Sequence, residues 1–92
     1  MLTHVVLMTF TDPTDAPAAK AKLEAIASDI PAIRSMVVGL DMLGTDVSWH
    51  LCMTTTHDDA DGLRSYQTHE AHLDLATWLR PRLAARAVVD YV

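Results

Sequence analysis

One short segment in the second half of the chain gathers side chains that can do acid–base chemistry. Residues 66–72 read Tyr-Gln-Thr-His-Glu-Ala-His, so the phenol of Tyr66 lies close in sequence to the imidazoles of His69 and His72. A neutral imidazole, with a pKa of about 6.5, can take a proton from a carbon flanked by carbonyl groups. A phenol hydroxyl within reach can stabilise the enolate oxygen that then develops. His72 and Tyr66 are therefore candidate catalytic residues.

The helix that carries these residues must break for the two side chains to meet. On one continuous helix, residues six apart lie about 120° from each other around the axis. Tyr66 and His72 converge only if the helix breaks near residues 68–70, where Thr68 is the expected cap of a new helical start. The alternative is that Tyr66 is a core aromatic residue and His72 belongs to the helix surface.

Two further histidines, His4 and His50, fall on two predicted strands. If both side chains point toward the helices, they line a pocket under the second helix together with His69. For either residue alone, a buried histidine satisfied by a backbone or hydroxyl partner is the commoner case. His57 follows the third strand beside two aspartates, and we expect it to be solvated.

A metal site is not indicated by the spacing of these residues. His69 and His72 are three apart on a helix and could share an ion, but Glu70 projects from a different face and no third ligand follows from the sequence. Cys52 lacks a neighbouring base and is expected to pack in the core. We therefore expect neither a metal nor a cofactor.

The patterns of apolar residues predict the elements that position these side chains. A strand rich in β-branched residues is followed by a helix with apolar residues at three- and four-residue steps, two strands around a short turn, a second helical region and a closing strand. The predicted ranges are 3–10 for the first strand, 15–29 for the first helix, 36–43 and 47–56 for the paired strands with a turn at 44–46, 58 to about 81 for the second helical region, and 86–92 for the last strand.

This order of elements predicts one α+β domain over residues 1–92. Strand, helix, strand, strand, helix, strand is the ferredoxin-like βαββαβ arrangement, a four-stranded antiparallel sheet with both helices on one face. Half of the 92 residues are hydrophobic, more than so small a domain can bury alone. We expect a homodimer in which two sheets pair and close into a dimeric α/β barrel.

Composition also limits the partners and the compartment. The formal net charge is −5, which argues against nucleic acid and anionic membranes as partners. The single cysteine excludes an intrachain disulfide and indicates a reducing compartment. The N-terminal apolar run is too short for a signal peptide or membrane span, so we expect a cytoplasmic protein.

Several motifs, taken in order, resemble the stress-responsive A/B barrel (Dabb) family of dimeric ferredoxin-like barrels. They are His4-Val5-Val6-Leu7, Ile30-Pro31, Gly39, Tyr66-x-x-His69-x-x-His72 and Val88-Val89-Asp90-Tyr91. Together they cover nearly the whole chain.

The chain is similar at several of these positions to a plant polyketide cyclase of the family, which closes a linear polyketide thioester by aldol condensation without cofactor. That resemblance implies His72 as the base, Tyr66 as its hydroxyl partner, and His4 and His50 as pocket histidines. Leu23, near a pocket tyrosine of the cyclase, and Glu70, in place of a common proline, depart from its pattern.

The resemblance leaves three functions open. The first is binding of a small apolar carbonyl or aromatic compound between sheet and helices, with cyclase-like proton transfer. The second is a non-enzymatic stress or assembly protein whose pocket is packed core. The third is a cofactor-independent monooxygenase that uses Trp49 and a histidine.

Overall fold

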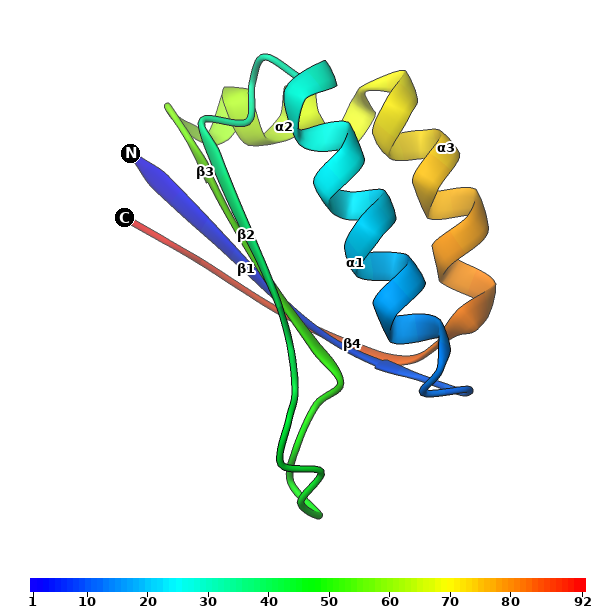
Figure 1. Ribbon diagram of the computed structural model, residues 1–92. Helices are drawn as coiled ribbons and strands as arrows, with labels where there is room; N and C mark the ends of the chain where they lie inside the picture. Colours follow the sequence, from blue (N-terminus) through cyan, green and yellow to red (C-terminus); the bar gives the residue numbers. More distant parts are fainter.

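The computed structural model describes all 92 residues and arranges them as one sheet with its helices on one face (Figure 1). This confirms the predicted ferredoxin-like order, with the second helix divided in two. The elements are β1 (Leu2–Phe10), α1 (Asp15–Ile26), η1 (Ala27–Asp29), β2 (Ser35–Leu40), β3 (Leu51–His57), α2 (Ala60–Thr68), α3 (Glu70–Leu79), η2 (Arg80–Arg82) and β4 (Leu83–Tyr91).

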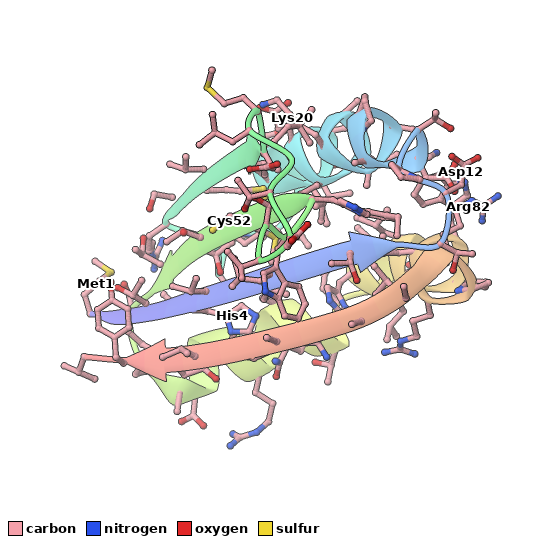
Figure 2. All side chains as sticks on the ribbon, turned by 90° about the horizontal axis from the view of Figure 1, so that it is seen from below. Met1, His4, Asp12, Lys20, Cys52 and Arg82 are labelled. Atoms are coloured by element: carbon pink, nitrogen blue, oxygen red, sulfur yellow. The ribbon has the colours of Figure 1, made fainter.

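The sheet has the strand order β2-β3-β1-β4, and its three ladders are all antiparallel. The first strand is therefore central and pairs on both sides. Val6 of β1 lies opposite Met53 of β3 and Val88 of β4. Seen from below, the four strands lie side by side with the helices behind them (Figure 2).

The two faces of β1 differ because successive side chains of a strand point to opposite sides. His4, Val6, Met8 and Phe10 are buried on the face that the helices cover, whereas the alternate residues are only partly buried. The helix-covered face therefore carries the core, and it also carries the histidine at position 4.

The first helix packs on this face through the apolar stripe that the sequence predicts. Ala19 and Leu23 of α1 are buried, and Ile30 and Ile33 continue the contact beyond the helix. The regular helix ends at Ile26, and a 3-10 turn over Ala27–Asp29 completes the predicted range of 15–29.

The second helical region breaks at His69, within the 68–70 range where a break is required for Tyr66 and His72 to meet. His69 has an extended backbone (φ −64°, ψ 141°), which ends α2 and begins α3 in a new direction. The predicted capping residue was wrong. His69 itself caps α3, since its Nδ1 accepts a hydrogen bond from the Ala71 N–H at 3.1 Å, whereas the Thr68 hydroxyl donates to the Arg64 carbonyl at 2.9 Å.

The connection between β2 and β3 is longer than the predicted turn at 44–46. The strands end at Leu40 and resume at Leu51, and the intervening residues project beyond the sheet (Figure 1). Asp41 accepts a hydrogen bond from the Gly44 N–H at 2.8 Å, and Gly44 takes the positive φ (63°) that favours glycine. Local hydrogen bonds of this kind compete with strand pairing, which shortens both strands relative to the prediction.

The last strand begins earlier than predicted, at Leu83 instead of Arg86. Pro81 lies in the 3-10 turn that precedes it, and a shift of register between Thr9 and Phe10 lets Leu83 pair with Phe10. Strand β4 therefore pairs with β1 from Thr3 to Phe10 and brings Leu83 and Arg86 to the cavity that residues of α3 also line.

The contribution of the N-terminal cap of α2 to stability can be tested directly. Asp59 accepts a hydrogen bond from the Gly62 N–H at 2.8 Å. Replacing Asp59 with alanine should lower the free energy of unfolding by about 1 kcal/mol, which corresponds to a Tm about 4–8 °C lower for a domain of this size. Thermal unfolding followed by circular dichroism measures the change. Asp46→Ala, an exposed site in the β2–β3 connection, is the control, and an unchanged Tm for Asp59→Ala would contradict the capping role.

Candidate functional site

A cavity of ≈ 320 Å³ lies between the sheet and the helices α2 and α3. Nine of its fourteen lining residues are hydrophobic, including Leu23 of α1 and Met53 of β3. Tyr66 is among these nine, and the other five lining residues are polar and include two of the predicted site histidines. The polar lining residues are His4, Gln67, His72, Arg80 and Arg86.

Tyr66 lines this cavity near His4 and His72 and is almost completely buried. Its hydroxyl donates only to the sulfur of Met53, at 3.8 Å, which is a weak acceptor. Burial raises the pKa of the phenol to about 12, with the charge of Arg86 opposing part of the shift. The phenol therefore stays protonated near neutral pH and keeps a donor for an oxygen atom placed beside it.

His72 packs edge-on against Tyr66, with ring centroids 4.7 Å apart and planes at 73°. Burial lowers the pKa of its imidazole, the nearby Gln67 backbone opposes this, and the positive charges of Arg80 and Arg86 add to it. The Nδ1 atom is buried without a hydrogen-bond partner of normal geometry. His72 is therefore an inward-facing imidazole that is neutral near pH 7, as a general base must be.

His4 lines the same cavity from β1, with its ring centroid 6.3 Å from that of Tyr66. Its Nδ1 lies 2.5 Å from a carboxylate oxygen of Asp90, the residue opposite it on β4. A carboxylate that accepts from Nδ1–H fixes the ring orientation and leaves the lone pair on Nε2. Asp90 has no arginine partner, and Arg34 pairs instead with Asp58.

His57 supports the site through Tyr66 without lining the cavity, and sequence reasoning misplaced it. It was expected to be solvated, but it is 0% exposed and stacks on Tyr66 with ring centroids 5.3 Å apart. Its Nδ1 donates to the Ala32 carbonyl at 2.8 Å, and its Nε2 accepts from the Thr55 hydroxyl at 2.8 Å. The alternation of buried residues through β3 continues to this position and was the missed signal.

His50 does not line the cavity, in contrast to the sequence expectation. Its Nδ1 accepts a hydrogen bond from the Phe10 N–H at 2.8 Å, and its ring stacks on Phe10. His50 precedes β3, in a bend, and its N–H donates to the Met8 carbonyl at 2.9 Å. The ring is therefore held beside Phe10 at the end of β1, apart from the residues that line the cavity.

His69 is also outside the cavity wall, because its ring caps α3. Its position nevertheless matters to the site. The break that it makes turns the following helix so that His72, three residues later, faces Tyr66. His69 is thus a positioning residue at the hinge between the two helices.

Metal ligands and membrane spans are not evident in the structure. No group of three or more His, Cys, Asp or Glu side chains is arranged to hold an ion. None of the helices combines the length and apolar character that crossing a bilayer requires. Trp49, considered above for oxygen chemistry, lines a separate hollow with Leu7 and Cys52, away from the cavity histidines.

Comparison with known proteins assigns the chain to a family. The model of the stress responsive A/B barrel domain matches residues 2–92. The chain belongs to the Dabb family. This establishes the resemblance inferred from the motifs, although the closer similarity to a polyketide cyclase is not specifically supported. No curated protein matches the chain.

Solved structures share the Dabb fold over almost the whole chain. A dimeric ferredoxin-like protein of unknown function from Bacteroides fragilis is 28% identical, with a TM-score of 0.87 and coverage of 98% of this chain and 93% of that chain. A Dabb family protein from Mesorhizobium loti is 18% identical (TM-score 0.82; coverage 99% and 94%). A hydroxynitrile lyase from Passiflora edulis is 12% identical (TM-score 0.83; coverage 98% and 90%) and shares the fold alone.

The buried histidines predict how stability depends on pH. Burial lowers the folded-state pKa values of His57 and His72 below the ordinary value of 6.5, so the unfolded chain binds more protons at acidic pH. Their contribution to stability is complete above pH 6.5 and is lost as the pH falls below it.

We therefore expect the free energy of unfolding to decrease between pH 7.5 and 5.5, measured by urea titration at one protein concentration. The His57→Gln variant should show a smaller decrease. Equal pH dependence in the two proteins would contradict the assignment of a buried, neutral His57.

Proposed function

We propose that this Dabb domain binds a small, mostly apolar carbonyl compound in its cavity and catalyses a cofactor-free proton transfer on it, as in polyketide cyclisation. The observation that carries the proposal is a ≈ 320 Å³ cavity lined by Tyr66 together with His72 and His4. A cavity of this size and apolar lining is at the lower end of the range for small-ligand sites.

The ring of His72 has one nitrogen that can serve as the base. Nδ1 is shielded from solvent and His72 lines the cavity, so we assign Nε2 as the ring nitrogen that reaches the ligand. A proton on Nδ1, toward the Gln67 backbone, leaves the lone pair on Nε2. The lowered pKa keeps this nitrogen unprotonated near neutral pH.

The chemistry then follows from the positions of the two side chains. Nε2 of His72 takes a proton from the carbon beside a carbonyl group, and the Tyr66 hydroxyl donates a hydrogen bond to the resulting enolate oxygen. In an aldol closure the enolate carbon forms a bond to a second carbonyl carbon, whose π bond breaks to give an alkoxide. The imidazolium of His72 returns its proton to that oxygen.

His4 and Asp90 add a second oriented imidazole to the wall. With Asp90 as acceptor for Nδ1–H, the Nε2 atom of His4 can accept from a hydroxyl or enol group of the ligand. We assign His4 a positioning role in the pocket and Asp90 the role of holding its ring.

The cavity also bears on the competing functions. In a purely structural or assembly protein, core side chains would be expected to fill the space beneath His72, since interiors are close-packed. A monooxygenase that relies on Trp49 would need that ring beside a cavity histidine, and it lies in the separate hollow. Both observations favour the proton-transfer function.

Replacing His72 with alanine tests the base directly. Phenylacetone is a neutral ketone suited to the cavity, and exchange of its CH₂ protons for deuterium can be followed by proton NMR in D₂O. We expect the protein to accelerate the exchange and the His72→Ala variant to lose roughly 10²–10⁴-fold of that acceleration. The wild-type rate should fall on acidification, with a midpoint below pH 6.5.

The matched control is Thr77→Ala, on the exposed side of the same helix. It should keep the wild-type rate. Equal acceleration by the wild type and His72→Ala would remove His72 from the mechanism, and no acceleration by the wild type would argue against the proposed reaction.

We also propose that the chain forms a homodimer through the sheet face opposite the helices (Figure 2). That face carries exposed apolar side chains, among them Val37 (68% exposed), Val89 (61%) and Tyr91 (53%). Burying such a surface is favourable, and the Bacteroides fragilis relative is dimeric. We therefore propose that this face packs against the same face of a second copy of the chain.

A charge placed on this face should separate the protomers. Val89 pairs with Val5 across β4 and β1, so Val89→Glu would bury a carboxylate between the sheets. Light scattering after size exclusion should give twice the chain mass of 10.1 kDa for the wild type and one chain mass for Val89→Glu. The control, Leu73→Glu on the exposed side of α3, should stay dimeric, and a dimeric Val89→Glu would contradict this interface.

A further inference from the structure

The charged groups of the cavity wall are unusual for an acidic protein. The chain has a net charge of −5, yet no Asp or Glu lines the cavity. The permanently charged lining residues are Arg80, at the end of α3, and Arg86, on β4. The face of Arg86 is fixed by its strand partner, because it pairs with Met8, which also lines the cavity.

Neither arginine has a partner within the protein. Arg34 and Arg64 are bound to Asp58 and Asp61, and no ion pair or side-chain hydrogen bond involves Arg80 or Arg86. Arg80 and Arg86 are also not needed to bind the carbonyl groups at the C-terminal end of α3. Arg82 already serves that purpose, since it donates to the Trp78 carbonyl at 2.7 Å and covers the Trp78 ring.

The charge of these arginines extends to the reactive side chains. Both oppose protonation of His72, and Arg86 favours ionisation of Tyr66. A ligand placed against the two rings therefore lies within the field of two cations. An anionic group on that ligand would supply the acceptor that both guanidinium groups lack.

We propose that the cavity selects small carboxylates: the carboxylate group is held by Arg80 and Arg86, and an apolar or aromatic body extends toward Tyr66 and His72. At about 30 Å³ for each water-sized atom, the cavity holds a ligand of roughly ten non-hydrogen atoms. An aryl or short-chain keto acid fits this description. The inference rests on the proposed function, for which it names the substrate class.

Measurements of ligand affinity test this inference without requiring that the protein catalyse a reaction. Phenylacetate and phenylacetamide have the same shape and differ in charge, and each can be titrated into the whole chain while amide NMR signals are recorded. We expect phenylacetate to shift signals of cavity residues and to bind about tenfold or more tightly than phenylacetamide. The preference should weaken as salt is raised.

Arg80→Gln and Arg86→Gln should each lower the affinity for phenylacetate about tenfold while leaving that for phenylacetamide nearly unchanged. Arg64→Gln, on the outer surface of α2, is the matched control and should keep the wild-type affinity. Inorganic phosphate at the same concentration should compete poorly, because it lacks the apolar body.

Four results would overturn the inference: equal affinity for the two compounds, a preference that survives both arginine substitutions, effective competition by phosphate, or no binding of phenylacetate at all. If any of these occurs while His72-dependent exchange of phenylacetone persists, the proposed function stands and only the substrate class is wrong. If phenylacetate binds as expected but exchange is absent, the cavity takes carboxylates and the proposed reaction is wrong.

Discussion

The contact between Tyr66 and His72 is the interaction on which the site depends, and it exists because the second helix breaks at His69. On an unbroken helix the two side chains would diverge by about 120°. The extended backbone of His69 redirects α3, and the ring of His69 accepts a hydrogen bond from the new helical start. The cost of interrupting a helix is thus partly offset by a cap, and the two rings meet at 4.7 Å.

Burial sets the protonation states of the Tyr66 and His72 side chains. Tyr66 lies between His72 and His57, which is itself locked by Thr55 and the Ala32 carbonyl, so the phenol has little freedom to move. Desolvation raises the pKa of the phenol and lowers that of the His72 imidazole. The same environment therefore keeps the donor protonated and the base unprotonated over a common range of pH.

Local patterns in the sequence predicted much of this arrangement. The order of elements and the stripe of α1 followed from periodicity, and helix geometry showed where a break was required for Tyr66 and His72 to meet. The alternation of side chains along β3 would also have predicted that His57 is buried, because His57 follows Leu51, Met53 and Thr55 on the same face. The expectation for His50 failed for another reason, because the residue precedes β3 and its ring is held against Phe10 at the end of β1.

Other features depend on pairing between distant segments and could not be predicted locally. Asp90 meets His4 because β4 lies beside β1 in one register, across 86 positions of the chain. Arg80 and Arg86 enter the cavity wall through the turn after α3 and the early start of β4. A sequence shows that these residues are present, but only the fold shows which charges remain without partners.

The most direct measurement of the central claim is an NMR titration of the His72 imidazole, assigned by comparison with the His72→Ala variant. An inward-facing, desolvated ring should titrate with a midpoint below 6.5, and its signals should change when phenylacetone is added. A midpoint at or above 6.5, together with signals that do not respond to the ketone, would mean that the ring faces solvent, and the account of the site would be wrong.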